Sequence, residues 1–236
     1  MSIDEAALAE SLRRLSLSRE DNGSVISALE AVIAACVDLF GVSGAGVLIA
    51  DEQNMLRYVA ASDHPGRILE RTEVDAGEGP CTEAFVTTQV VTSRDVTAEA
   101  DRWPVLARTL ADQPVRAVLG VPVRLGGVPV GTLDVYMDRP HDWDDTEVSA
   151  LTRYAEVIAT TLAAAVQAHT AGEMAKQLQF ALDYRVVIER AVGFLMASRS
   201  IDAVAAFNAL RTSARSRRTK INVVAEHVLE NGALPG

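Results

Sequence analysis

The sequence has few metal-binding or disulfide-forming side chains: two cysteines, Cys36 and Cys81, and four scattered histidines. The cysteines are far apart and form no CxxC pattern, which excludes a disulfide framework and a zinc-binding cysteine motif. No two histidines stand at a metal-ligand spacing. We therefore expect no metal and no cofactor, and free thiols fit a reducing cytoplasm.

Long hydrophobic runs are also missing. The longest apolar stretches, such as 157–166, are short and rich in alanine and threonine, well below the roughly 20 apolar residues that a membrane-spanning helix needs. The opening MSIDEAALAESLRRL is acidic and helical and lacks the basic start and apolar core of a signal peptide. These absences predict a cytoplasmic protein without a membrane segment.

Catalytic motifs are a third absence. The sequence contains no P-loop, no GxSxG, no HExxH, and no Ser/His/Asp set that would come together by sequence position. The adjacent carboxylates Asp144 and Asp145 stand where a helix begins, and capping explains them sufficiently. We expect the protein not to be an enzyme.

The charge is unevenly distributed along the 236 residues. The net charge is −10, but the part from Glu173 onward has nine basic and six acidic residues, leaving 13 basic and 26 acidic residues before it. The front is thus −13 and the tail +3. With 49% hydrophobic residues, this length predicts two folded domains, an acidic one followed by a mildly basic one.

The apolar pattern of the first part indicates helices and antiparallel strands. Helical spacing covers residues 4–17, and a second helix follows Ser24 and ends at Gly41. Expected strands are 45–50 and 56–61, then QVVTSRDV after the loop DAGEGP and a short helix around 82–87, then VRAVLGVPVRL and VPVGTLDVYM joined by two glycines. Two glycines between β-branched runs favour a tight hairpin. The pattern predicts an α+β fold with a mostly antiparallel sheet flanked by helices.

From Asp144 the pattern becomes helical to the end. One long helix has apolar positions from Val148 to Ala165 at steps of three and four, and it either continues past Met174 or ends near Gly172. The spacing suits a parallel two-stranded association as well as packing on the protein's own sheet, and both stay open. Two shorter helices, 201–213 and 221–229, follow, with a basic turn between them.

The stretch GEGPCTEAFVTTQVVTSRDV, then RWP, then VRAVLGVPVRLGGVPVGTLDVY resembles a GAF domain over residues 20–168. The resemblance implies a sensor fold but no particular ligand, because GAF domains bind many ligands or none. A pocket would lie between the sheet and the glycine-rich loop, with Glu78, Gly79 and Cys81 as candidate ligand-binding residues. Cys81 precedes a helix, where a thiolate is stabilised, but a small buried apolar role explains it better.

The C-terminal segment LQFALDYRVVIERAVGFLMASRSIDAVAAFNALRTSARSRRTKINVVAEHVLE resembles the ANTAR domain over its whole length. The resemblance implies a three-helix unit that binds RNA hairpins overlapping a terminator, so that transcription continues. One position departs from the family, which often has a lysine before its glycine where this sequence has Val192 in AVGFLM. If that lysine contacts RNA, affinity is weaker here or the target differs.

Basic side chains of the tail are the candidate RNA contacts, because guanidinium groups neutralise phosphates and stack on unpaired bases. They are Arg185, Arg190, Arg211, Arg215, Arg217, Arg218 and Lys220. A net charge of +3 alone would favour an ordinary solvated face over an RNA site. The family resemblance reverses that preference.

These patterns predict a helical segment at 1–20, a GAF sensor at 21–170 and an ANTAR domain at 171–236. The predicted function is transcription antitermination by a homodimer that binds RNA hairpins, controlled by a small-molecule or protein signal at the GAF domain. One alternative is a DNA-binding regulator that uses the last two helices as a helix-turn-helix. Another is a signalling or scaffold protein without RNA binding.

Overall fold

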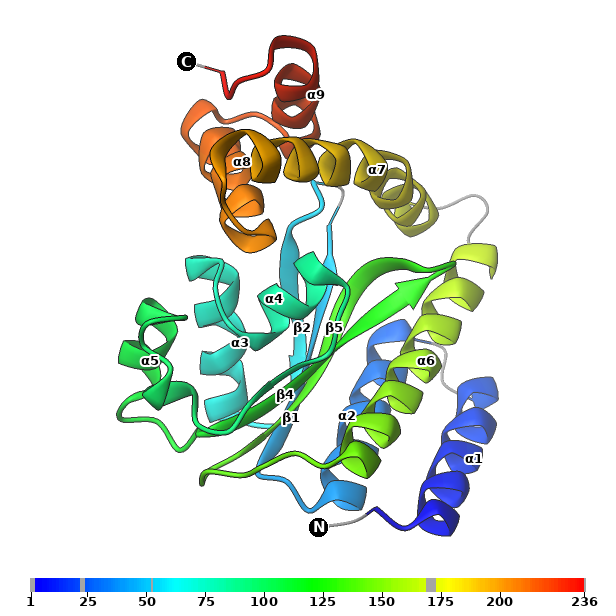
Figure 1. The fold of residues 1–236 in the computed structure, drawn as a ribbon. Coiled ribbons are helices and arrows are strands. Elements are labelled where there is room, and N and C mark those ends of the chain that lie inside the picture. Colours follow the sequence, from blue (N-terminus) through cyan, green and yellow to red (C-terminus); the bar gives the residue numbers. More distant parts are fainter. Residues whose placement is uncertain (1–2, 22–23, 52, 169–172, 236) are drawn as a thin grey trace.

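A five-stranded sheet forms the centre of the larger part of the molecule (Figure 1). The computed structural model describes residues 3–21, 24–51, 53–168 and 173–235. The strands are β1 (Gly44–Ala50), β2 (Leu56–Ala61), β3 (Val91–Ser93), β4 (Ala117–Leu125) and β5 (Val128–Met137). Their order is β2-β1-β5-β4-β3 and all neighbours are antiparallel. The predicted α+β fold with an antiparallel sheet is confirmed.

The hairpin between β4 and β5 depends on its two glycines. Gly126 and Gly127 have φ of 57° and 86°, the left-handed region in which glycine has no steric penalty. Leu125 pairs with Val128 across this turn, as a two-residue connection requires. The tight hairpin expected from the sequence is therefore present.

Helices cover both faces of the sheet (Figure 1). One face is covered by α2 (Val25–Phe40) and α6 (Asp145–Ala168), with α1 (Glu5–Asp21) packed outside them. The other face carries α3 (His64–Ala76), α4 (Pro80–Thr87), the short 3-10 helix η1 (Val96–Ala98) and α5 (Pro104–Leu110). The sequence pattern had not indicated α3 or α5. No helix among the described residues is long and apolar enough to cross a bilayer.

The long helix α6 uses its apolar stripe inside its own chain. Leu151, Ile158 and Leu162 are buried in the same core cluster as Leu133 of β5. Of the two explanations left open for the stripe, the structure therefore shows packing on the sheet. The following helix α7 (Glu173–Arg199) crosses above the end of α6 and does not extend its line (Figure 1). The boundary expected at 170/171 and the possible helix end near Gly172 fall on residues 169–172, which lie outside the described residues, and both stay predictions.

The last three helices form a separate small unit at one end of the sheet (Figure 1). They are α7, α8 (Ala203–Arg217) and α9 (Ile221–Asn231), and each packs on the other two. Their shared core contains Ile188, Leu195, Leu210, Val224 and Val228, all buried. Asp202 caps α8 by accepting a hydrogen bond from the amide of Ala205 at 2.7 Å.

No described residue closely approaches Gly193 of α7, although its lack of a side chain would permit it. A Cβ atom built there meets no atom within 4 Å, so the glycine faces open space. Ala191, two residues earlier, is fully buried in the small core instead.

Candidate nucleic-acid interface and buried acidic cluster

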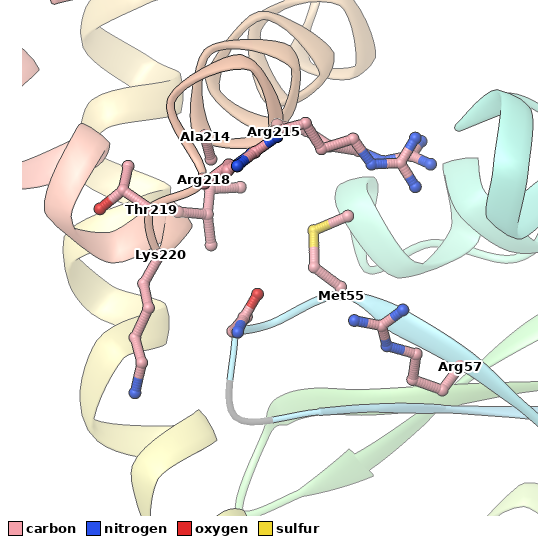
Figure 2. A pocket seen from close by; sticks show the side chains of 10 residues that line it. Met55, Arg57, Ala214, Arg215, Arg218, Thr219 and Lys220 are labelled. Atoms are coloured by element: carbon pink, nitrogen blue, oxygen red, sulfur yellow. The ribbon is translucent and has the colours of Figure 1, made fainter.

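A basic cleft lies between the C-terminal helices and the β1–β2 hairpin (Figure 2). Its volume is about 550 Å³, and its lining consists of Gln53, Met55, Arg57, Arg211, Ala214, Arg215, Arg218, Thr219, Lys220 and Ile221. Half of these residues are cationic and none is acidic. Such a concentration of positive charge in a concave surface attracts phosphate.

The turn between α8 and α9 brings three of the cations into the basic cleft. Arg218 ends α8 with a left-handed φ of 53°, and its amide bonds back to the carbonyls of Ala214 and Arg215. Lys220 then begins α9 as its N-cap residue. This reversal places Arg215, Arg218 and Lys220 around one opening (Figure 2).

The cleft also receives a cation from the sheet. Arg57 on β2 lines it, although its Nε donates to Asp51 Oδ2 at 2.6 Å, which offsets part of its charge. Arg57 was not predicted as part of a site, because strand β2 is far from the C-terminal helices in the sequence. Only the docking of the two units brings it to the site.

Helix α8 docks on the C-terminal end of α3. The Arg211 guanidinium donates to the carbonyls of Val74 and, at 3.2 Å, Asp75, and Arg215 donates to Asp75 at 3.3 Å. Asn208 donates to the carbonyl of Gly77 at 2.7 Å. A helix C-terminus carries a partial negative charge and unpaired carbonyl groups. The two arginines therefore satisfy and neutralise the end of α3.

Gly77 makes this docking sterically feasible. It is the C-cap of α3 with a φ of 74°, a conformation that favours glycine. A Cβ atom there would overlap with the guanidinium of Arg211. A side chain at this position would thus conflict both with the backbone and with α8.

Burial changes the titration of Arg211. Its side chain is 5% exposed, and removal from water, together with the positive charge of Arg215, lowers its pKa to about 10. The group still carries its proton at neutral pH. Its charge is therefore available to the carbonyls of α3 and to the wall of the cleft.

An apolar contact supports the same docking. Phe85 of α4 and Phe207 of α8 meet edge to face, with ring centroids 6.4 Å apart and an interplanar angle of 79°. Both rings are buried in a cluster that joins Leu48 and Cys81 to the core of the last three helices. The two units thus share a continuous hydrophobic contact.

We expect Arg211→Ala to loosen this docking. The change leaves the carbonyl oxygen of Val74 without its donor and removes one of the two donors to the carbonyl of Asp75, at a cost of about 1–3 kcal/mol. Amide hydrogen exchange in α8 and at the end of α3 should become roughly tenfold faster or more. Arg217→Ala is the matched control, since Arg217 is in the same helix but exposed; equal exchange in both variants would contradict the docking.

A second candidate site is buried between the sheet and helices α3 and α4. Three carboxyl groups, Glu70, Glu73 and Asp134, lie with the thiol of Cys81, and all four side chains are at most 1% exposed. Ligand atoms of Glu70, Cys81 and Asp134 are within 4.8 Å of one another. We call these four residues the acidic cluster.

Glycines on both sides of Asp134 make room for the acidic cluster. In the sheet, Asp134 of β5 pairs with Gly46 on one side and Gly120 on the other. A Cβ atom at Gly46 would overlap with Glu70 Oε1, and one at Gly120 would be 3.4 Å from the backbone of Pro80. The missing side chains let Glu70 and the first turn of α4 close on Asp134.

Burial raises the pKa of every ionisable group in the acidic cluster. For Glu73 the loss of hydration raises the pKa to about 8, opposed by the Thr82 amide, which donates to Glu73 Oε2 at 2.8 Å. Burial and the charge of Asp134 raise the pKa of Glu70, and burial raises that of Asp134 and Cys81. A group of such acids favours either shared protons or a cation.

Comparison with protein families decides the assignment of the two units. Residues 23–163 match the model of the GAF domain, and residues 176–229 match that of the ANTAR domain. The chain belongs to the GAF family and carries an ANTAR domain. Both resemblances seen in the sequence are confirmed, and this GAF–ANTAR protein pairs a sensor domain with an ANTAR-type regulatory domain. A search of curated proteins found no match.

Solved structures share the fold of the sensor part. The GAF domain of an Acinetobacter phosphoenolpyruvate-protein phosphotransferase is 18% identical with a TM-score of 0.55, covering 67% of this chain and 94% of that one. Free methionine-R-sulfoxide reductase from Neisseria meningitidis, solved with its substrate, is 20% identical with a TM-score of 0.55, covering 71% and 96%. At this identity the likeness establishes the fold only.

Only some of the predicted RNA-binding residues of this GAF–ANTAR protein line the basic cleft. Arg211, Arg215, Arg218 and Lys220 line the basic cleft, with Arg211 buried. Arg190 and Arg217 are exposed and do not line the cleft. The side chain of Arg185 lies outside the described residues.

The predicted ligand-binding residues of the GAF domain, Glu78, Gly79 and Cys81, do not line one common site. Glu78 turns to α5, where its carboxylate accepts from the amides of Val105 and, at 3.1 Å, Leu106. Gly79 has a φ of 132° and packs on Glu73, while Cys81 enters the acidic cluster. Glu70, Glu73 and Asp134 were not predicted from the sequence. The signal for Asp134 was its position as an aspartate in the middle of the apolar run VPVGTLDVYM.

Gly46 provides a direct test of this packing. We expect Gly46→Ala to lower the free energy of unfolding by about 1–3 kcal/mol, because a methyl group there overlaps with Glu70. Adding Glu70→Ala should recover much of that loss. Gly193→Ala is the control: its Cβ has open space in a helix, so it should be neutral or stabilising by up to about 1 kcal/mol. Denaturant titrations measure all three variants, and an unchanged free energy of unfolding in Gly46→Ala would contradict the packing of Glu70 against Gly46.

Proposed function

We propose that this GAF–ANTAR protein is a non-enzymatic transcription antitermination regulator that binds RNA hairpins overlapping a terminator. The observation that carries the proposal is the basic cleft, where five of the ten described lining residues, from both domains, are cationic and none of those ten is acidic. The cleft concentrates charge that the net charge of −10 conceals. The ANTAR match supports RNA as the anionic partner.

The docked interface supports control by the sensor domain. Arg211 and Arg215 contribute both to the cleft and to the contacts with the end of α3. A signal that shifts α3 would therefore change the position of cations that bind RNA. Such coupling requires a ligand that binds the two arrangements with different affinity.

A homodimer would strengthen binding without further contacts. Two ANTAR units held together convert the second hairpin contact into an intramolecular one, which raises the overall affinity. Avidity of this kind would compensate for a small basic surface. The protein would act in the cytoplasm, where nascent transcripts are made.

The test compares hairpin RNA with duplex DNA of equal length across a salt series. Full-length protein should prefer the RNA hairpin, and log K should fall linearly with log salt concentration because phosphate contacts release counterions. Preference for duplex DNA would overturn the proposal in favour of a DNA-binding regulator. Absence of binding to either nucleic acid at low salt would overturn it in favour of a protein-interaction role.

A further inference from the structure

We infer that the acidic cluster is a binding site for one divalent transition-metal ion, with Glu70, Cys81 and Asp134 as its ligands. The sequence predicted no metal site, because the four residues are distributed over α3, α4 and β5 and form no local motif. The folded chain alone brings them together.

Unpartnered oxygen atoms point to a missing cation. Both carboxylate oxygens of Glu70, Oε1 of Glu73 and Oδ2 of Asp134 are buried, and no donor from the described residues outside the cluster hydrogen-bonds to them. Buried carboxylates without a partner are costly. Either an acid proton shared within the cluster or a bound cation must compensate for the lost hydration, and a cation satisfies several of these oxygens at once.

The geometry suits a metal ion. Ligand atoms within 4.8 Å of one another need to approach by no more than about 1.5 Å, since two donors on one tetrahedral ion with bonds of 2.0–2.3 Å are about 3.3–3.8 Å apart. Glu70 occupies the space that Gly46 leaves, and the α4 backbone before Cys81 packs on Gly120. These contacts hold three donors from three elements around one point.

The donor set indicates the class of ion. A thiolate beside carboxylates favours a borderline-soft ion such as Zn²⁺, Fe²⁺ or Co²⁺ over Mg²⁺ or Ca²⁺, which take oxygen ligands only. Binding requires the Cys81 thiol to lose its proton to solvent, with the sulfur then bonded to the metal. No change of oxidation state is involved.

Cobalt is a suitable probe, because a thiolate bonded to Co²⁺ gives a ligand-to-metal charge-transfer absorption. Full-length protein, reduced and stripped with a chelator, should bind one Co²⁺ per chain with this band, and Zn²⁺ should displace it. Cys81→Ser should abolish the band. Asp134→Asn and Glu70→Gln, which preserve volume, should weaken Co²⁺ binding at least tenfold.

Cys36→Ser is the matched control, because Cys36 is equally buried but belongs to α2 on the other face of the sheet. This variant should retain the band and the affinity. The proposal is overturned if the unmodified protein binds no stoichiometric Co²⁺. It is also overturned if the charge-transfer band is retained in Cys81→Ser, or if the band is lost in Cys36→Ser but not in Cys81→Ser. The first of these tests uses the unmodified protein, so the proposal can be overturned even if a variant fails to fold.

Discussion

The double variant Arg218→Asn/Lys220→Ser is expected to bind hairpin RNA at least tenfold more weakly while its fold stays intact. Both side chains line the basic cleft, so the variant loses two phosphate contacts. A tenfold loss corresponds to about 1.4 kcal/mol. The slope of log K against log salt concentration should also decrease by about 1.4–1.8, the value for two released counterions.

The substitutions are chosen to preserve the backbone of the α8–α9 turn. Arg218 has a left-handed φ of 53°, which asparagine tolerates better than most residues. Lys220 is the N-cap of α9 without a capping side-chain bond, and serine is a better residue there by up to about 1 kcal/mol. The variant should therefore unfold at the same temperature as the parent protein or slightly above it.

The effect of a lower net positive charge must be separated from the effect of losing cations in the basic cleft. The control is Arg94→Gln/Arg139→Gln, which removes the same number of positive charges outside the cleft. These two arginines form exposed ion pairs with Asp142 and Asp138, and such pairs contribute little to stability. This control should bind hairpins almost as the parent does. If both double variants lose affinity equally, the basic cleft is not the RNA site and only the overall charge matters.

The second large effect is expected for the aromatic pair between the two domains. Phe207→Ala should lower the free energy of unfolding by about 3–5 kcal/mol, because it removes a buried ring and leaves a cavity in the core. Phe85→Ala should have a similar effect in the sensor domain. Denaturant titrations followed by circular dichroism measure both.

The double variant decides whether the domains are docked in solution. Edge-to-face rings in contact have a coupling energy of about 0.5–1.5 kcal/mol, so the two losses should not add. Phe207→Ala combined with Trp103→Ala is the control, since Trp103 belongs to a different buried cluster and distant losses add within about 0.5 kcal/mol. Additivity in both pairs would mean that Phe85 and Phe207 do not meet.

Local signals predicted most of the secondary structure. The strands with β-branched residues and the Gly126–Gly127 turn depend on near neighbours, and the structure contains both. Helix α3 was missed because RILERTEVDA is rich in charge, and two of its carboxylates, Glu70 and Glu73, are buried against expectation. Glutamates in a helix normally face water.

The residues of the candidate sites were harder to predict from the sequence than the secondary structure. The basic turn from Arg215 to Lys220 was predicted because four of its six residues are basic, whereas the role of Arg211 in docking was not predicted. Nothing in the sequence around Arg211 indicates that Val74 and Asp75, more than 130 residues earlier, supply its acceptors.

The sequence by itself determined the two families, the antiparallel sheet and the opposite charges of the two parts, because these follow from local pattern and composition. Tertiary structure alone decided which cations share the basic cleft and which acids share the buried acidic cluster. Pairing of β5 with β1 and β4 places Asp134 between two glycines, and helices packed over that gap supply the remaining donors. Contacts between distant segments arise only when the chain closes on itself, and no local spacing encodes them.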